Sequence, residues 1–265
     1  MRTLVLFAIV ILMSTVVAET AAQTLPDPQA VTDPKKISSK PNAQVEPRSL
    51  TIEKLYMTRQ VGRPTWSPDG KSIAFISNMS GRNNLWLVPA EGGWPVQLTV
   101  SDQRQTAPAW SPDGKWIAYQ SDYDGDEQWD IFLVSPTTGK VVNLTQTREI
   151  AELNPTWSPD GRYLAGENGS TAVTAGVFVY DFQNRTYDKL TDFGEWPTWL
   201  PDSRRVLFGD GGRNFWIVDR QTKKAKPIYS GGHDVLGPPH LTLDGRAIFY
   251  TRRITEADIW LMTLQ

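Results

Sequence analysis

One motif recurs five times along the chain and limits the folds that are open to it. The string "PTWSPDGKSIAF" begins at Pro64, and two close copies begin at Pro108 and Pro155. Two weaker copies, "PTWLPDSRRVLF" and "PHLTLDGRAIFY", begin at Pro197 and Pro239. A period of about 40 to 50 residues is typical of repeat proteins, in which each unit packs on its neighbours.

The spacing of the repeat is regular. Counted between the aspartates of the five copies, it is 44, 47, 42 and 42 residues. Because all five aspartates hold one position of the same motif, we expect them to shape turns rather than to act in catalysis. They are Asp69, Asp113, Asp160, Asp202 and Asp244.

Each unit contains short apolar segments separated by turn formers. In the first unit the segment ending at Trp66 is followed by "SPDG", whose proline, aspartate and glycine favour a tight turn. The next segment, "SIAFIS", alternates apolar side chains at Ile73 and Phe75, as a half-buried strand does. A third segment surrounds Trp86, and a fourth, "VQLT", ends at Thr99. The unit is therefore predicted to be a four-stranded antiparallel meander.

Repeated meanders of this length arranged around an axis form a β-propeller. We therefore predict an all-β chain, a propeller of five four-stranded blades near residues 62–107, 108–153, 154–196, 197–237 and 238–265. The fifth unit supplies three strands before Gln265, and "RSLT" at residues 48–51 resembles the ends of the other fourth strands. We expect a strand within residues 49–58 to complete the last blade and close the ring. An open stack of sheets is the alternative.

The amino-acid composition argues against several classes of function. The 27 lysines and arginines stand against 29 aspartates and glutamates, a net charge of -2, so we expect no nucleic acid partner. The chain has no cysteine, which excludes disulfides, thiol nucleophiles and thiolate metal sites.

Two segments precede the repeats. Met1 and Arg2 are followed by an apolar run from Leu4 to Val17 and then Ala18, a pattern typical of a secretory signal peptide at residues 1–18. The run is shorter than the roughly 20 residues that cross a bilayer, so we expect cleavage and no membrane insertion afterwards. Residues 19–48 are rich in small and polar residues and are predicted to be a disordered linker. The propeller, residues 49–265, is then expected in the periplasm or outside the cell.

The repeat resembles that of a known family. The pattern "PxWSPDGKxIAF", followed by "NLWLV" and "VQLT", resembles the repeat of TolB-type propellers. These are similar to the N-terminal propellers of dipeptidyl peptidase IV and of prolyl-oligopeptidase-type enzymes. The resemblance covers residues 62–265 and implies a propeller in a Gram-negative envelope. Because residues 19–61 are short and polar and the repeats run to the end of the sequence, we expect neither the mixed α/β domain of TolB nor a hydrolase domain.

No residues form a catalytic pattern. The chain lacks the Gly-x-Ser-x-Gly turn of serine hydrolases, and Ser230, His233 and Asp234 lie too close in one loop for triad geometry. His233 and His240 are the sole histidines and no carboxylate at ligand spacing joins them. We therefore expect no enzyme activity and no cofactor.

One acidic segment is a weak calcium candidate. Asp122, Asp124 and Asp126 alternate as in a calcium loop, but the glycine is misplaced and no glutamate follows at the twelfth position. The segment coincides with a predicted hairpin, so a solvated turn is the favoured interpretation and no metal is expected.

The tryptophans fall into two groups. Those in the repeat are expected to pack in the core: Trp66, Trp110, Trp157 and Trp199 in first strands and Trp86, Trp216 and Trp260 in third strands. Those off the repeat lie in or beside loops and are either anchors of a binding surface or locally packed: Trp94, Trp129 and Trp196.

The connections between successive blades are the predicted binding site, because they gather at one face of a propeller. They carry charges of both signs, which suits a protein or peptide: Arg63, Arg104, Glu149, Glu152, Glu195, His233 and Asp234. The leading hypothesis is a monomeric, non-catalytic module that binds an envelope protein or peptide. The alternative is a stand-alone propeller that gates or recruits peptides for a separate hydrolase. Carbohydrate or metal binding stays open as a third class.

Overall fold

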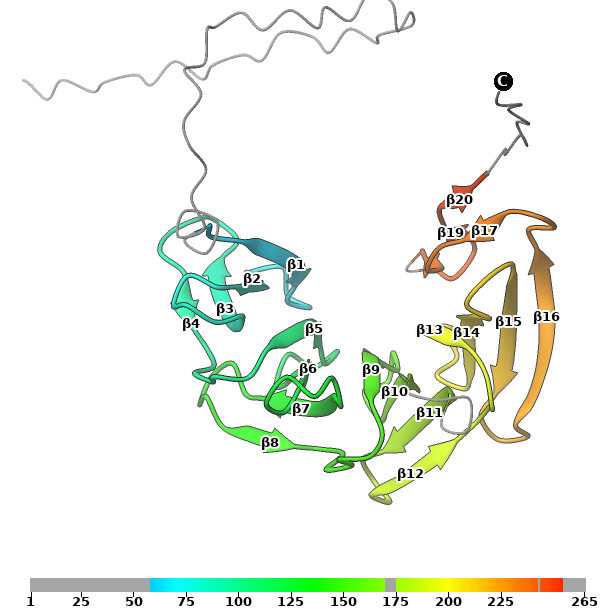
Figure 1. Cartoon of the computed structure of the whole chain (residues 1–265), viewed down its shortest axis with the longest axis horizontal. Helices are drawn as coiled ribbons and strands as arrows, with labels where there is room; N and C mark the ends of the chain where they lie inside the picture. Colours follow the sequence, from blue (N-terminus) through cyan, green and yellow to red (C-terminus); the bar gives the residue numbers. More distant parts are fainter. Residues whose placement is uncertain (1–57, 170–174, 243, 255–265) are drawn as a thin grey trace, which may run out of the picture. The chain divides into compact units, whose positions relative to one another are not determined.

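The computed structural model describes residues 58–169, 175–242 and 244–254. The chain divides into two units, Met1–Thr51 and Ile52–Gln265, and all described residues belong to the second. Their regular structure consists of strands alone (Figure 1). No helix in these residues is long and apolar enough to cross a membrane. The predicted signal peptide and linker lie outside the described residues.

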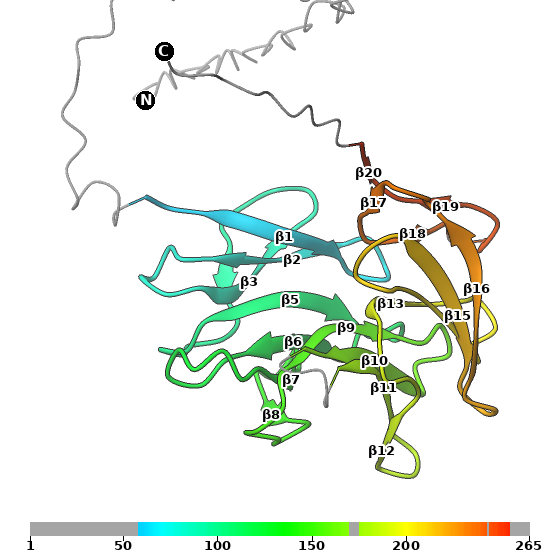
Figure 2. The ribbon, with the colours of Figure 1, turned by 45° about the vertical axis from the view of Figure 1, so that its right-hand side comes forward.

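Four sheets of four antiparallel strands follow one another along the chain (Figure 2). Each is a meander in sequence order, as predicted. The first contains β1 (Val61–Trp66), β2 (Ser72–Ser77), β3 (Asn84–Pro89) and β4 (Val96–Gln97). The second contains β5 (Gln105–Trp110), β6 (Ile117–Ser121), β7 (Asp130–Val134) and β8 (Val141–Asn143). The third contains β9 (Glu152–Trp157), β10 (Tyr163–Asn168), β11 (Gly176–Asp181) and β12 (Thr186–Lys189), and the fourth β13 (Glu195–Trp199), β14 (Arg205–Gly209), β15 (Asn214–Asp219) and β16 (Lys224–Ser230).

The fifth repeat is described in part. Two short antiparallel pairs join β17 (Val235–Leu236) to β20 (Arg252–Arg253) and β18 (His240–Leu241) to β19 (Ile248–Phe249). They correspond to the first and second strands of a blade. The third strand predicted around Trp260, and the closing strand predicted within residues 49–58 apart from Thr58, lie outside the described residues. The count of five blades therefore stays a prediction.

The repeated turn is built by its own side chains. The Ser67 hydroxyl donates to Oδ1 of Asp69 at 2.6 Å, and the same oxygen accepts the Lys71 N–H at 3.1 Å. Gly70 has a φ of 71°, in the left-handed region that favours glycine. The hydroxyl and the N–H hold the pKa of Asp69 below its ordinary value. The second, third and fifth copies repeat the hydroxyl-to-aspartate bond, so these aspartates serve turn geometry.

The first-strand tryptophans join neighbouring blades. Nε1 of Trp110 donates to the Thr65 carbonyl at 3.3 Å and Nε1 of Trp157 to the Ala109 carbonyl at 3.0 Å, in each case in the preceding blade. Trp199 is 5 % exposed and packs in the core, as expected, whereas Trp66 is 60 % exposed. The expectation of core packing is wrong for Trp66, because no blade that precedes it is among the described residues.

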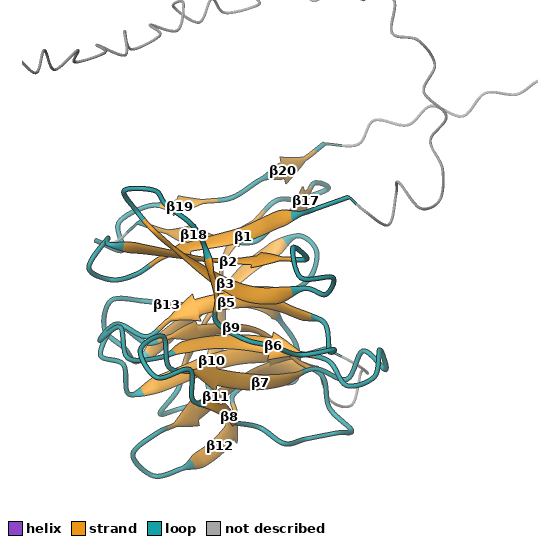
Figure 3. Ribbon diagram, turned by 90° about the vertical axis from the view of Figure 1, so that its left-hand side faces the viewer, coloured by secondary structure: helices purple, strands orange, loops and turns teal. Residues whose placement is uncertain are grey.

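Because the strands of each sheet alternate in direction, the connections between them lie alternately at two ends of the sheet (Figure 3). At one end the first strands begin, at Val61, Gln105, Glu152 and Glu195; we call it the connection end. At the other end lie the repeated turns that follow the first-strand tryptophans; we call it the turn end. The hairpins between second and third strands also lie at the connection end, since second strands run back toward it.

Candidate functional site

A polar pocket of about 410 Å³ opens at the connection end between the first two blades. It is formed by the hairpin before β3, the connection from β4 to β5, and the hairpin between β6 and β7. Its lining residues are Arg82, Asp102, Gln103, Arg104, Asp122, Asp124, Gly125 and Glu127. The pocket therefore brings together three of the predicted residues, Arg104, Asp122 and Asp124.

Arg104 is the central cation of this pocket. Its Nη2 lies 3.2 Å from Oδ2 of Asp122 and 3.7 Å from Oε1 of Glu127. The guanidinium carbon sits 4.7 Å from the centre of the Trp129 ring, within the range of a cation–π contact. The side chain nevertheless keeps 47 % of its surface exposed. Arg104 is thus held in one orientation while about half of its side chain stays exposed.

The backbone around Arg104 is fixed as well. Oδ1 of Asp122 accepts the Arg104 N–H at 2.9 Å, and the Asp122 N–H donates to the Arg104 carbonyl at 3.2 Å. Next to this pair, Nε2 of Gln103 donates to Oδ1 of Asp124 at 3.1 Å, and the Asp124 N–H donates to Oε1 of Gln103 at 2.6 Å. The connection and the hairpin therefore form one hydrogen-bonded unit.

The weak calcium candidates do not converge on a common point. Asp122 is engaged by Arg104, Asp124 by Gln103, and Oδ1 of Asp126 accepts the Gln128 N–H at 2.9 Å. Among the described residues no three His, Asp or Glu side chains are grouped as metal ligands would be. These three carboxylates instead organise the hairpin that carries Trp129.

Glu152 is a correction to the predicted rim, because its side chain is fully buried. The Thr147 hydroxyl donates to its Oε1, and its Oε2 has no hydrogen-bond partner among the described residues. Burial raises the pKa of Glu152 to about 7, and the charge of Asp130 adds to the effect. A carboxyl in this position does not contact a partner at the surface.

A second buried glutamate, Glu167 on β10, was not predicted. Nδ2 of Asn154 donates to its Oε1 at 2.9 Å, and the backbone N–H of Trp196, in the next blade, donates to its Oε2. Burial raises the pKa of Glu167 to about 7, and the neighbouring charge of Glu195 acts in the same direction. The same repeat position in the second blade is Gln120, whose Oε1 accepts the Asn154 N–H at 3.0 Å. This position therefore joins consecutive blades at the connection end.

The other predicted residues are at or near the connection end but do not share a pocket with Arg104. Asp234 forms an ion pair with Arg252, so it is engaged within the fifth repeat. Arg63, Glu149, Glu195 and His233 are exposed and form no ion pair within the part of the chain that the structure describes. Ser230 accepts the Gly232 N–H at 3.4 Å.

The tryptophans off the repeat differ in their settings. Trp94 is 92 % exposed. Trp129 lies against Arg104, and its carbonyl accepts the Glu152 N–H at 2.7 Å. Trp196 has a φ of 56° and gives its N–H to Glu167. Only Trp129 belongs to the surroundings of the polar pocket.

Arg82, Asp102, Gln103 and Glu127 also line the pocket, although they are not among the predicted binding residues. The predicted binding face consists of residues in the connections between blades. The predicted meander could have indicated Arg82 and Glu127. In a four-stranded meander the hairpin between the second and third strands lies at the same end as the connections between blades. Both residues stand in those predicted hairpins.

Successive antiparallel meanders, joined by tryptophan hydrogen bonds from blade to blade, define the protein as a β-propeller. The chain belongs to the TolB beta propeller domain family, whose model matches residues 51–238. Among curated proteins, none matches the chain.

Solved structures show the same fold at low sequence identity. TolB from Acinetobacter baumannii is 22 % identical with a TM-score of 0.57, over 71 % of this chain and 48 % of that one. Oligogalacturonate lyase from Vibrio parahaemolyticus is 17 % identical with a TM-score of 0.59, over 71 % of this chain and 57 % of the lyase. A prolyl endopeptidase is 18 % identical with a TM-score of 0.52, over 69 % of this chain and 31 % of the enzyme. The chain spans about half the length of the Acinetobacter protein.

Proposed function

We propose that this chain is an exported, non-catalytic propeller that binds a protein or peptide partner in the cell envelope through its connection end. The observation that carries the proposal is the geometry of Arg104. Its guanidinium is held by Asp122, Glu127 and Trp129, and the side chain is still about half exposed in a polar pocket. A preorganised, partly open guanidinium suits a carboxylate of a partner, with which it can form paired hydrogen bonds.

The export and the envelope location rest on the sequence. The predicted signal peptide at residues 1–18 supports export, and the resemblance to TolB-type propellers supports the envelope. A partner of mixed charge suits the pocket, because Arg82 and Arg104 stand beside Asp102 and Glu127.

The non-catalytic role is supported by how the acidic side chains are used. Four of the five turn aspartates accept a hydroxyl of their own turn, and Asp122 and Asp124 hold the pocket together. The similarity to oligogalacturonate lyase and prolyl endopeptidase structures makes these two activities the ones to test.

Purified protein is expected to release no product from oligogalacturonate or from prolyl peptides. Mn²⁺ is included with oligogalacturonate, because one similar oligogalacturonate lyase structure is a complex with manganese.

Substitution of Arg104 is expected to weaken partner binding by about tenfold or more, because the partner's carboxylate loses its counter-charge. A photoreactive amino acid placed at Asp102 should give one discrete adduct in living cells, and Arg104→Ala should abolish it. Lys115→Ala is the matched control, since Lys115 is an exposed cation at the turn end of the same blade, paired with Asp113 at 3.1 Å. An adduct that Arg104→Ala leaves intact would refute the proposed contact.

The adduct's identity separates the two functional hypotheses. The resemblance to the prolyl endopeptidase propeller favours, as a second candidate, a module that recruits peptides for a separate hydrolase. A serine hydrolase in the adduct would establish that candidate. An envelope protein without hydrolase activity would establish the first.

A further inference from the structure

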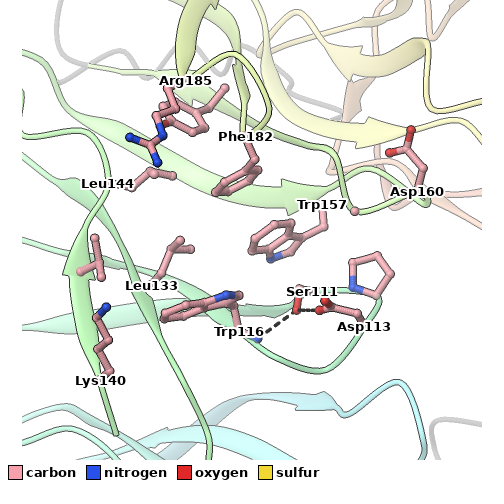
Figure 4. A pocket seen from close by; sticks show the side chains of 14 residues that line it. Ser111, Asp113, Trp116, Leu133, Lys140, Leu144, Trp157, Asp160, Phe182 and Arg185 are labelled. Carbon is pink, nitrogen blue, oxygen red and sulfur yellow. Dashed lines mark hydrogen bonds between the residues drawn. The ribbon is translucent and has the colours of Figure 1, made fainter. Parts of the chain in front are cut away.

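A larger groove lies at the turn end, between the second and third blades (Figure 4). Its volume is about 720 Å³, within the range of sites that hold a ligand or a short peptide segment. The walls are largely apolar: Trp116 and Leu133 come from the second blade and Trp157 and Phe182 from the third. The rings of Trp157 and Phe182 stack at 4.9 Å, so one wall is a flat aromatic surface.

Comparison with the equivalent positions between the other blades shows how this groove differs. Between the first two blades, the positions of Trp116 and Phe182 are held by Ser72 and Pro136, and the space is about 570 Å³. Here both positions are aromatic and the space is larger.

Between the third and fourth blades, side chains of the protein occupy the equivalent space. Tyr163 and Arg220 hold the same two positions, and the guanidinium carbon of Arg220 lies 3.9 Å from the centre of the Tyr163 ring. The Tyr163 ring also lies 5.9 Å from that of Trp199, and both side chains are buried. The groove between the second and third blades has no such filler, because Phe182 stacks on Trp157 instead. Its aromatic walls are therefore open to another molecule.

The charges around the groove are arranged in two groups. Asp113 and Asp160 are at one side, and each already accepts the hydroxyl of its own turn. Lys140 and Arg185 are at the other side, and neither takes part in an ion pair among the described residues. Two cations without an ion pair therefore lie on the side of the groove away from Asp113 and Asp160.

We propose that this groove binds a linear segment of a partner protein in which an aromatic or aliphatic side chain is followed by acidic residues. The apolar side chain occupies the slot between Trp116 and Phe182, and the carboxylates pair with Lys140 and Arg185. This site is independent of the polar pocket, because the two lie at opposite ends of the sheets.

Two labelled peptides test the proposal by fluorescence anisotropy on the full chain. They are acetyl-Gly-Leu-Phe-Asp-Asp-Gly and acetyl-Gly-Leu-Phe-Lys-Lys-Gly, which differ only in their two charged residues. The acidic peptide is expected to bind at least about tenfold more tightly than the basic one. Trp116→Ser should weaken binding of the acidic peptide by about tenfold or more, because one aromatic wall of the groove is lost. Since the first blade has serine at this position, the substitution is compatible with the fold.

Charge reversal completes the test. Lys140→Glu should remove the preference for the acidic peptide, whereas Lys226→Glu, which reverses another exposed cation in a different blade, should leave it unchanged. Arg104→Ala should also leave peptide binding unchanged, which separates this site from the polar pocket. The proposal is overturned if neither peptide binds at about 1 mM, or if Trp116→Ser binds the acidic peptide as the unmodified chain does.

Discussion

Replacing Trp199 by alanine is expected to lower the free energy of unfolding by about 3 to 5 kcal/mol. The side chain is 5 % exposed and its ring lies 5.9 Å from that of Tyr163. Its Nε1 donates to the Thr156 carbonyl of the preceding blade at 3.1 Å. The substitution removes a buried ring, a hydrogen bond and a contact between two blades at once.

Two further variants separate these contributions. Trp199→Phe keeps a ring but loses the N–H, so a loss of about 1 kcal/mol is expected for the hydrogen bond, together with a smaller packing loss. Trp66→Ala changes the same repeat position where the ring is 60 % exposed, and it should cost less than about 1 kcal/mol. Urea unfolding followed by circular dichroism measures all three. Equal losses for Trp66→Ala and Trp199→Ala would contradict the assigned role of the tryptophan between blades.

This comparison shows how far the sequence predicts the fold. The turn motif fixes where each first strand ends and each second strand begins, because proline, aspartate and glycine act within a few residues. The meander of each blade follows from that regularity. Whether a given tryptophan is buried depends instead on the blade beside it. Trp66 and Trp199 share one local sequence context and differ in their neighbours.

The candidate site was predictable in place but not in detail. The blade connections point to the connection end, and Arg104 does lie in a pocket there. Glu152 was assigned to the same surface, although it occupies the repeat position of Gln105, which is also buried. At the start of a strand a shift of one residue turns a side chain from solvent to the interior. Charge alone therefore did not distinguish Arg104 from Glu152.

The stability of the propeller is expected to fall as the pH rises from about 4.5 to about 7, because of Glu152 and Glu167. Burial raises the pKa of each from 4.5 to about 7. Within this window the folded state holds a proton that the unfolded state has lost, so raising the pH favours unfolding. Full ionisation of each carboxyl costs up to about 3 kcal/mol, at about 1.4 kcal/mol per pKa unit.

Other carboxylates do not obscure this window. The pKa values of Asp69, Asp113, Asp202 and Asp244 are lowered by hydrogen bonds within their turns. Their contribution to stability is present above the ordinary carboxyl pKa and is lost only as the pH falls below about 4. The two effects have opposite signs and occupy separate pH ranges.

The variant Glu167→Gln isolates one of the two groups. The second blade already has Gln120 at this position, where its Oε1 accepts a backbone N–H of the next blade, so the geometry accommodates the amide. At pH 8 the variant should be more stable than the unmodified chain by about 1 to 3 kcal/mol, and at pH 5 nearly equal to it, since glutamine never ionises. Urea unfolding at several pH values between 5 and 8 gives both slopes. Glu149→Gln is the matched control, because it neutralises an exposed carboxyl in the connection before β9 and should leave the slope unchanged. If Glu167→Gln keeps the full slope of the unmodified chain, Glu167 is ionised in the folded state well below pH 7 and its bond to Trp196 links the blades as a charged group.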